Sequence, residues 1–459
     1  MLIEPQYYSF KDPDAYVVKK EKGYTRYIFL RYKDQYNHLM QSGLYDELIK
    51  EQLLIPHQEI LPDTSDPKVY KQILPNQIQF QSYPFEWSFI QWRKAILAFL
   101  KINLIALEYG MILKDASPFN FYLKGGKAIL FDTSSFIFFK NNDPWLAYRQ
   151  FCESFFSPLA LMKYNGATWA KFARVSLRGM PLKFVSKQLK IRSWFNPTCL
   201  LHIHLHATYQ NKKGATSKPQ KGFSKNQLQE LFGMFISCVR SWKQAHAFTE
   251  TWIKYYDQDI ESKQYLSNKQ SIVAEWLAQI KPRTVIDLGA NTGLFSILAS
   301  KIADHVIAAE FDDTCVDQIE LAIQKNKIQN LSTLVTDLAE TSPSLGMLNK
   351  EYRSLLERGK SNLVMALALV HHLSIGKNLS MAHIAELFSE LSSQYAIVEF
   401  IPKTDPKVKL LLQSRQDIFP NYTEKNFHEK FYHYFDLIDE RKIQDSHRTI
   451  YLLKKKIGS

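Results

Sequence analysis

Residues that could hold a ligand are concentrated in the stretch VIDLGANTGLFS, residues 285–296. Asp287 lies in an apolar run, and Gly289 and Gly293 follow it where glycines let a backbone approach a ligand closely. A second apolar run, HVIAAEF, carries the acid Glu310, 17 residues after Gly293. In nucleotide sites built on parallel sheets, an acid at about this distance binds the ribose. The spacing therefore predicts a site for a ligand that contains a nucleoside.

The turn lacks the middle glycine of the dinucleotide-binding pattern GxGxxG. Ala290 and Asn291 stand in its place, which disfavours a bulky pyrophosphate. A smaller zwitterionic tail fits better, and S-adenosylmethionine joins such a tail to adenosine without a phosphate. We therefore expect S-adenosylmethionine at this turn.

The elements that must position the turn alternate between helices and strands. This alternation is typical of a parallel sheet with helices on both faces. A helix is expected to stop at Lys281-Pro282, because proline cannot continue it. The expected order is helix 271–280, strand 284–288, helix 294–303 and strand 305–311.

Residues 271–459 resemble a class I S-adenosylmethionine-dependent methyltransferase domain. The resemblance rests on DLGANTG and on the strand candidates around LVTDLAE (334–340), NLVMALALVHHL (362–373), YAIVEFIP (395–402) and HRTIYLLKKK (447–456), the last as the antiparallel strand that closes the sheet. It implies an α/β Rossmann-like fold with a seven-stranded, mostly parallel sheet.

The resemblance also implies the residues of the cofactor site. Glu310 would bind both ribose hydroxyls, Phe311 would cover the adenine, and Asp337 would accept from the adenine amino group. Leu338 would offer a backbone N–H. The full expected set is Asp287, Gly289, Asn291, Gly293, Glu310, Phe311, Asp337 and Leu338.

Methyl transfer to a hydroxyl, an amide or a carbon acid also needs a general base. The candidates lie at the carboxyl ends of strands, where ligands bind such sheets: His371 and His372 after the fourth strand, and Glu399 on the fifth. Each has an alternative role, since a histidine can pack or cap the strand end and Glu399 can pair with a nearby base. The segment 342–347 is either one wall of the substrate pocket or a helix entry.

In residues 1–160, short aromatic-rich strand candidates, YTRYIFLRY and IQFQSYPF, alternate with helices, of which 88–109 is the clearest. A different motif lies in the same region, in YGMILKDASPFNFYLKGGKAILFDTSSF, residues 109–136. It resembles the catalytic segment of protein kinases and aminoglycoside phosphotransferases, in which HxDxxxxN supplies a base and a metal ligand and a later Asp holds Mg²⁺. The resemblance implies an α+β kinase-like domain, with Asp115 as the base and Asn120 and Asp132 as metal ligands.

Several departures argue against phosphotransfer by this region. Leu113-Lys114 replaces the expected His and Arg or Gly, and Thr-Ser rather than Phe-Gly follows Asp132. No glycine-rich loop precedes the motif, and no nucleotide-handling lysine can be assigned. We therefore expect a kinase-like module that lacks phosphotransfer and that presents substrate, binds a partner or senses a nucleotide.

The positive charge is concentrated between these regions. The chain has a formal net charge of +13, yet residues 281–459 hold 22 Lys and Arg against 22 Asp and Glu. Residues 160–256 hold 16 Lys and Arg but only the acids Glu230 and Glu250. Such a segment is either a footprint for a polyanion or a solvated basic surface with a flexible loop.

The expected organisation is therefore a kinase-like domain over 1–160, a basic, mainly helical connector over 161–256 with a flexible loop at 207–227, and the methyltransferase domain over 257–459. The two parts together resemble an uncharacterised bacterial group labelled as methyltransferases or as nodulation-related. The shared phrases include SYPFEWSF, LKDASPFN, PWLAYRQF and VEFIPK. This resemblance strengthens the expected architecture and does not name a reaction.

Composition limits location and metal chemistry. No apolar run reaches the roughly 18 residues that span a bilayer, and MLIEPQYYSF has neither a basic leader nor a long apolar core, so we expect a cytoplasmic protein without a membrane partner. The four cysteines have no metal-binding spacing, and no metal is expected. His202, His204 and His206 would share one face only on a strand, and a packing role is the expectation there.

The expected function is S-adenosylmethionine-dependent methyl transfer to an unidentified acceptor, with a small molecule or a carrier-bound intermediate favoured over RNA. One alternative is a Mg-ATP-dependent phosphotransferase whose carboxyl-terminal domain senses S-adenosylmethionine. Another is a nucleic-acid-binding protein that uses the basic connector.

Overall fold

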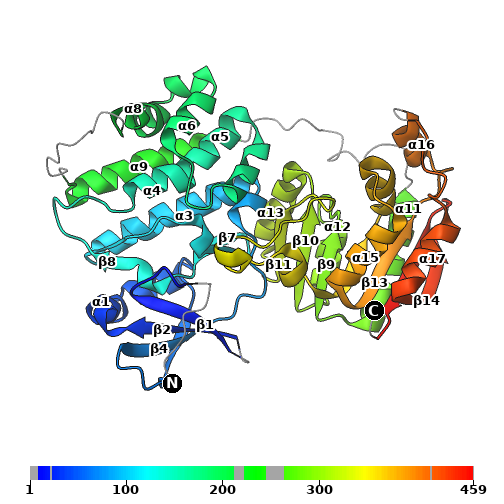
Figure 1. Ribbon diagram of the computed structural model, residues 1–459, viewed down its shortest axis with the longest axis horizontal. Helices are drawn as coiled ribbons and strands as arrows, with labels where there is room; N and C mark the ends of the chain where they lie inside the picture. Colours follow the sequence, from blue (N-terminus) through cyan, green and yellow to red (C-terminus); the bar gives the residue numbers. More distant parts are fainter. Residues whose placement is uncertain (1–8, 21–22, 211–221, 244–262, 414–415, 458–459) are drawn as a thin grey trace. The chain divides into compact units, whose positions relative to one another are not determined.

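The computed structural model describes residues 9–20, 23–210, 222–243, 263–413 and 416–457 (Figure 1). The chain forms two compact units. The first unit comprises Met1–Ala247 and Leu345–Tyr352, and the second unit comprises Phe248–Ser344 and Arg353–Ser459. The 1–160 region and residues 161–247 of the connector region thus belong to the same unit.

The second unit is built on a seven-stranded sheet of order β11-β10-β9-β12-β13-β15-β14. Neighbouring strands from β11 to β13 pair in parallel, and β15 is antiparallel to both of its neighbours. The expected sheet is therefore present, although β14 was not foreseen. The strands are β9 (Thr284–Leu288), β10 (His305–Glu310), β11 (Leu331–Val335), β12 (Ser361–Ala366), β13 (Ser392–Phe400), β14 (Phe435–Lys442) and β15 (Thr449–Lys455).

Helices cover this sheet because its central strands are apolar on both faces. Side chains alternate along a strand, so Val285 points to one face and Ile286 to the other, and both are buried. Helices α11, α12 and α13 share one hydrophobic cluster with Val285. The helices are α11 (Lys263–Ile280), α12 (Leu294–Ser300), α13 (Asp313–Asn326), α14 (Leu355–Arg358), η10 (His372–Gly376), α15 (Met381–Leu391), α16 (Pro406–Gln413) and α17 (Glu424–Tyr434).

The first unit begins with a four-stranded antiparallel sheet of order β1-β2-β4-β3. A short 3-10 turn and two helices follow β2. The elements are β1 (Ala15–Lys20), β2 (Gly23–Phe29), η1 (Leu30–Tyr32), α1 (Lys33–Gln41), α2 (Leu44–Lys50), β3 (His57–Ile60) and β4 (Val69–Pro75).

The long helix α3 (Phe89–Glu108) follows this sheet and matches the expected helix. Ser88 caps its first turn by accepting from the Gln91 N–H. The strand expected over IQFQSYPF, residues 78–85, is wrong, because this stretch runs as a loop into the 3-10 helix η2 (Pro84–Glu86). Its aromatic rings are buried without strand pairing, and Pro84 provides no N–H for a ladder.

Two small two-stranded sheets, one of them a hairpin, and a helical bundle complete the first unit. The elements of these two sheets and their connections are β5 (Met111–Leu113), η3 (Pro118–Asn120), β6 (Phe121–Lys124), β7 (Lys127–Leu130), η4 (Thr133–Ser135) and β8 (Phe136–Phe138). The helices are α4 (Tyr148–Phe151), η5 (Cys152–Phe156), α5 (Ser157–Asn165), η6 (Ala167–Arg174), α6 (Leu182–Gln188), η7 (Ile191–Phe195), α7 (Pro197–Cys199), η8 (Leu200–Leu205), α8 (His206–Gln210) and α9 (Lys225–Ser241).

The expected loop at 207–227 is only partly described. Residues 211–221 lie outside the described residues, whereas residues up to Gln210 are helical and α9 begins at Lys225. Within the described residues, no helix combines the length and apolar character needed to cross a bilayer.

Residues 345–352 pack in the first unit although they lie between β11 and β12 in sequence. They contain the turn η9 (Met347–Asn349), and Leu345 and Tyr352 form a β-bridge. The Tyr352 ring lies 4.6 Å from that of Phe119, and Lys11 pairs with Glu351 at 2.7 Å. The first unit thus incorporates a segment inserted between two strands of the other sheet.

Candidate functional site

The turn after β9 has the backbone conformation that its glycines permit. Gly289 and Gly293 have φ angles of 72° and 84°, and Asn291 also adopts a left-handed conformation, with φ of 50°. A Cβ on Gly289 would lie 3.0 Å from the Leu369 side chain, and one on Gly293 would lie 2.9 Å from that of Ile319. The two glycines therefore allow the turn backbone to pack directly against the Leu369 and Ile319 side chains.

Glu310 ends β10 and is held by the backbone of two loops. Its carboxylate accepts from the N–H groups of Asn291 (2.7 Å), Phe311 (2.7 Å) and Asp312 (3.0 Å). Burial raises the pKa of Glu310, and these three donors oppose that shift. The carboxylate is thus fixed in direction mainly by neutral donors.

A cavity of about 340 Å³ adjoins this carboxylate at the carboxyl ends of the parallel strands. Six of the expected cofactor residues line it, together with the expected base His372; those six are Gly289, Asn291, Glu310, Phe311, Asp337 and Leu338. Residues 342–353 are not among its lining residues, nor are Asp287 and Gly293.

Lys377 crosses the part of the cavity between two expected adenine contacts. Its Nζ bonds to Asp337 Oδ2 at 2.6 Å and lies 4.7 Å from the centre of the Phe311 ring. The Phe311 side chain is half-exposed. Lys377 was not foreseen, because a lysine after a strand has no distinctive pattern.

Asp287 lies beneath the turn and is buried. The Ser296 hydroxyl donates to its carboxylate at 2.5 Å, which ties β9 to α12. Burial raises its pKa from the ordinary value of 3.8 to about 6, and the charge of Glu310 adds to the increase. Asp287 therefore supports the turn from below.

The two candidate histidines differ in exposure to the cavity. The rings of His371 and His372 lie 4.0 Å apart, but of these two only His372 lines the cavity. Burial, with the charge of Lys407, lowers the pKa of His372 from 6.5 to about 4. Burial, with the charge of His372, also lowers the pKa of His371, which is buried and has no hydrogen-bond partner among the described residues. Both rings are therefore neutral at neutral pH.

Glu399 lies in a buried network of charges rather than on the cavity. It accepts from Lys269 Nζ at 2.6 Å and from the Tyr265 hydroxyl at 2.9 Å. Arg448 donates to the same hydroxyl at 2.7 Å and pairs with Asp405. Burial raises the pKa of Glu399, but the charges of Lys269 and Arg448 outweigh that effect and lower it. This network matches the alternative of a carboxylate paired with a nearby base, and a catalytic role for Glu399 stays a prediction.

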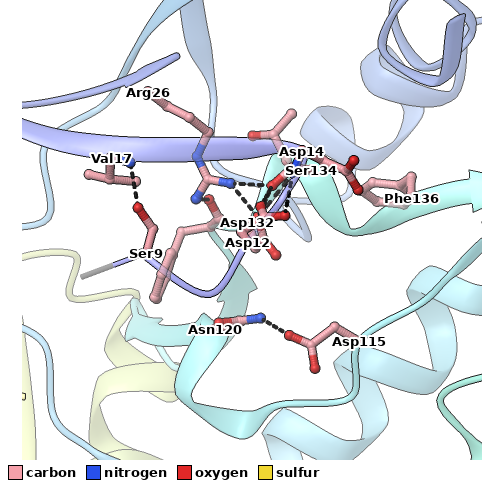
Figure 2. Close-up of polar contacts among 12 residues, drawn as sticks. Ser9, Asp12, Asp14, Val17, Arg26, Asp115, Asn120, Asp132, Ser134 and Phe136 are labelled. Carbon is pink, nitrogen blue, oxygen red and sulfur yellow. Dashed lines mark hydrogen bonds and ion pairs between the residues drawn. The ribbon is translucent and has the colours of Figure 1, made fainter. Parts of the chain in front are cut away.

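The first unit brings Asp115, Asn120 and Asp132 near one another, in two hydrogen-bonded groups (Figure 2). Asn120 donates to Asp115 Oδ2 at 2.8 Å, and Gln150 donates to the other oxygen. Burial and the charge of Asp132 raise the pKa of Asp115. The expected base thus has an amide on each carboxylate oxygen.

Asp132 is paired with a cation from the four-stranded sheet. Arg26, on β2, donates to Asp132 Oδ1, and the Ser134 hydroxyl lies 2.7 Å from the same oxygen (Figure 2). Burial raises the pKa of Asp132, but the Arg26 charge outweighs it and the pKa is lowered. Sequence reasoning missed Arg26, whose only signal was a charge inside the aromatic run YTRYIF.

A second acid shares this group. Asp12 Oδ2 lies 2.6 Å from the Ser134 hydroxyl, and Lys114 pairs with Asp14. Burial and the charge of Asp132 raise the pKa of Asp12. Asp12, Asp14 and Asp132 thus each have a cation of the same unit nearby.

The histidines of LLHIHLHATY lie on a helix, in the π-helical segment η8 and the start of α8. His202 bonds to the Tyr148 hydroxyl at 2.7 Å, and His204 lies between the Ser186 and Ser193 hydroxyls. The strand geometry that would align the three rings is absent there. Among the described residues, no group of three or more His, Cys, Asp or Glu side chains has metal-binding geometry.

Comparison with solved structures found similar chains of low sequence identity. The N-methyltransferase NodS from Bradyrhizobium japonicum WM9 is 7% identical, with a TM-score of 0.32, over 42% of this chain and 98% of NodS. Magnesium protoporphyrin IX methyltransferase from Synechocystis PCC 6803, with bound SAH, is 18% identical, with a TM-score of 0.34, over 46% of this chain and 96% of that enzyme. No protein-family model matches the chain.

Comparison of sequences found two named relatives. The nodulation protein NoeA of Rhizobium meliloti (strain 1021) is 31% identical over 382 residues, which cover 82% of this chain and 80% of NoeA. The 23S rRNA (uracil(1939)-C(5))-methyltransferase RlmD of Marinomonas posidonica is 33% identical over 101 residues, which cover 22% of this chain and 23% of RlmD.

In this chain the glycine turn follows β9, and the cavity lies at the carboxyl ends of the parallel strands, where ligands bind such sheets. The chain is an S-adenosylmethionine-dependent methyltransferase. By its similarity over most of both chains, it belongs to the family of the nodulation protein NoeA.

Proposed function

We propose that the second unit methylates a small molecule or an intermediate held on a carrier, in preference to RNA. The observation that carries this proposal is the lining of the cavity, in which leucines adjoin the expected cofactor residues; they are Leu338, Leu367, Leu369, Leu373 and Leu411. Lys377 is the one Lys or Arg among the lining residues, and it is paired with Asp337. A polyanionic acceptor would need several free cations there.

The residues present fit S-adenosylmethionine. The cavity volume of about 340 Å³ is within the range of small-ligand sites. A carboxylate, Glu310, reaches it from a strand end, as binding of two ribose hydroxyls requires. A Cβ at position 289 would crowd the Leu369 side chain, so glycine fits there. Without a side chain, its backbone can approach a ligand closely.

The chain's own residues would bind the cofactor and manage the proton. When bound, S-adenosylmethionine supplies an electrophilic methyl group. Glu310 would hold the ribose, Phe311 would stack on the adenine, and Asp337 would accept from its amino group. The leucines of the cavity would exclude water from the reacting atoms.

His372 is the proposed general base. A pKa of about 4 keeps its ring neutral at neutral pH, so a ring nitrogen can accept a proton from the acceptor. His371 would position it by ring contact at 4.0 Å. A base with this pKa predicts a rate that is level near neutral pH and falls as the pH drops through about 4.

We also propose that the kinase-like part of the first unit is catalytically inactive and binds substrate or a partner. The Arg26 guanidinium supports this, because it already neutralises the carboxylate that the resemblance assigns to Mg²⁺. A magnesium ion would have to displace a cation whose side chain is 8% exposed. The amides on Asp115 support the same proposal.

Calorimetric titration with S-adenosylmethionine tests the cofactor assignment. Glu310→Gln is expected to raise Kd by about 10- to 100-fold, because it removes a charged acceptor of hydrogen bonds. Glu386→Gln, at an exposed position on α15, is the matched control and should leave Kd unchanged. Equal affinity in both variants would refute the role of Glu310.

Transfer of isotope-labelled methyl to fractionated cell extract tests the acceptor class. Label is expected in the small-molecule or carrier fraction, and label in purified RNA would overturn the proposal. His372→Gln should lower the rate by at least about 100-fold without changing the cofactor Kd, whereas the exposed His433→Gln should not.

An ATP turnover assay with and without Mg²⁺ distinguishes an inactive kinase-like part from a phosphotransferase. We expect no magnesium-dependent ATP turnover. Turnover that is lost in Asp132→Ala would instead favour the phosphotransferase alternative.

A further inference from the structure

Residues 167–195 of the first unit expose an unusual number of large apolar side chains. The segment runs through η6, α6 and η7, and all of it is described. Single exposed apolar residues are ordinary on protein surfaces, but a group of them marks a site of interaction. The exposed fractions are Phe172 41%, Val175 80%, Phe184 42%, Ile191 72%, Trp194 43% and Phe195 82%.

These side chains are exposed even though the segment itself is well packed. Other residues of the segment are buried in the core of the first unit, among them Ala173, Leu182 and Val185. The Trp194 ring stacks on His204, with centroids 4.0 Å apart, and two serine hydroxyls fix that histidine. The exposed rings are therefore presented by a rigid support.

Hydrogen bonds bring separate turns of the segment together. Asn165, at the end of α5, donates to the Gln188 carbonyl at 2.7 Å and accepts from the Lys190 N–H at 3.4 Å. Because η6 begins at Ala167, the end of α6 and the start of η7 lie beside the start of η6. In Figure 1, α5, α6 and α8 form one end of the helical bundle of the first unit.

The same segment is strongly basic. Residues 154–229 contain no Asp or Glu. Within 167–195 the basic residues are Lys171, Arg174, Arg178, Lys183, Lys187, Lys190 and Arg192. A surface that combines exposed apolar side chains with an excess of basic over acidic residues is complementary to a lipid surface with anionic headgroups.

We propose that residues 167–195 bind the surface of an anionic membrane. The apolar side chains would enter the boundary between headgroups and acyl chains, and the lysines and arginines would contact lipid phosphates. Nucleic acid fits less well, because the aliphatic chains of Val175 and Ile191 can neither stack on bases nor bind phosphate. The sequence alone indicated no membrane partner, because it has no apolar run long enough to span a bilayer and does not reveal which side chains are exposed.

Sedimentation of the full chain with lipid vesicles tests the proposal. The vesicles are phosphatidylcholine alone or with about 30% phosphatidylglycerol, in low and high salt. Ile191→Ser/Phe195→Ser removes apolar contacts, and its control is Leu61→Ser, at a position 91% exposed. Lys187→Gln/Lys190→Gln/Arg192→Gln removes charge, and its control is Lys68→Gln/Lys124→Gln/Lys127→Gln, at exposed positions of the same unit.

The expected result is binding to the anionic vesicles and little binding to phosphatidylcholine. The apolar pair should weaken binding by at least about tenfold, and the charge triple by about 100-fold in low salt. Both controls should stay within about twofold of the unchanged protein. Absence of a preference for anionic vesicles would overturn the proposal.

Unchanged vesicle binding by the Ile191→Ser/Phe195→Ser variant would also overturn the proposal. Salt-sensitive RNA retention in that case would assign the basic surface to nucleic acid, and a change of oligomeric state would assign the apolar side chains to a second copy. If the apolar pair does not fold, quenching of tryptophan fluorescence by brominated lipid decides. The proposal requires quenching that is reduced in Trp194→Phe, and no quenching in the unchanged protein refutes it.

Discussion

The two units each have an acid at or shortly after the end of a strand, and the two acids have opposite kinds of partner. Glu310, at the end of β10, accepts from three backbone N–H groups and adjoins a cavity. Asp132, shortly after β7, is paired with the Arg26 guanidinium and the Ser134 hydroxyl. Backbone donors hold an acid in place without neutralising it, whereas a guanidinium cancels its charge.

This difference separates an acid kept for a ligand from an acid satisfied within the protein. Burial raises the pKa of Glu310, whereas the charge of Arg26 outweighs burial at Asp132 and lowers the pKa there. An acid that lacks a cation gains more from a ligand that donates hydrogen bonds. The comparison therefore favours chemistry in the second unit and recognition in the first.

Removing the cation of the first unit should have the largest effect on stability. Arg26→Met leaves the Asp132 carboxylate, 15% exposed, without its partner, so we expect unfolding of this unit to become easier by about 3 to 5 kcal/mol. Urea denaturation followed by tryptophan fluorescence measures this change. The exposed Arg31→Met, which loses only a surface pair with Asp14, is the control.

The double variant Arg26→Met/Asp132→Asn makes this test specific. Because it removes the charge as well as the cation, it should recover at least half of the lost stability. An Arg26→Met protein as stable as Arg31→Met would mean that the pair does not hold the first unit together, and the contrast with Glu310 would fail.

The next largest effect on the free energy of unfolding should come from Asp287, where substitution should stabilise the protein rather than destabilise it. Its pKa of about 6 lies above the ordinary 3.8, so the stability gained by protonation is fully present below pH 3.8 and is lost as the pH rises through 6. The shift corresponds to about 3 kcal/mol at neutral pH. Asp287→Asn removes the buried charge and should therefore stabilise the second unit at pH 7. The gain should be only up to about 2 kcal/mol, because the hydrogen bond from Ser296 is weaker to an amide than to a carboxylate.

Unfolding free energies of both proteins from pH 4 to pH 8 provide the measurement. The variant should lose the pH dependence between pH 4 and pH 6 that Asp287 contributes. Parallel curves for the two proteins would show that Asp287 is not the group that titrates.

The expected cofactor residues of the second unit could be predicted because they lie at or next to the ends of strands. Strand β9 has the expected bounds, and the turn and the acid after it need no knowledge of distant segments. Partners from far along the chain left no such signal. Arg26 and Asp132 are 106 residues apart, and Lys269 and Glu399 are 130 apart.

Two errors of sequence reasoning have related physical causes. Strand β14, FDLIDERK, was missed because it is an edge strand with mostly exposed, charged side chains. The stretch IQFQSYPF was expected to be a strand because aromatic side chains favour both strands and buried loops. The return of residues 345–352 to the first unit depends on the packing of Tyr352 against Phe119, which no local pattern encodes.

A smaller effect is expected at the turn itself. Gly293→Ala places a Cβ at a residue with φ of 84°, 2.9 Å from the Ile319 side chain, so we expect a loss of about 1 to 2 kcal/mol. Thermal unfolding measures it. Gly376→Ala, where a Cβ meets open space, is the control and should change stability little. Equal effects of the two substitutions would mean that the turn can relax.

The smallest effect should come from Lys377, the cation nearest to the proposed adenine site. Its bond to Asp337 resembles, in weaker form, the pairing of Arg26 with Asp132, but the Lys377 side chain is 40% exposed. An exposed pair contributes about 0.2 to 1 kcal/mol, so Lys377→Met should tighten S-adenosylmethionine binding about two- to fivefold by freeing Asp337. Calorimetry compares it with the exposed Lys360→Met.

Salt provides an independent check on the same pair. Because salt screens an exposed ion pair, the affinity of the unchanged protein should rise with ionic strength toward that of Lys377→Met. Weaker binding in Lys377→Met would have a different meaning, namely that the lysine contacts the bound cofactor. Lys377 would then be a cofactor-binding residue rather than a cation that competes for Asp337. The cation of the second unit would in that case serve the ligand, whereas Arg26 in the first unit neutralises an acid of the protein.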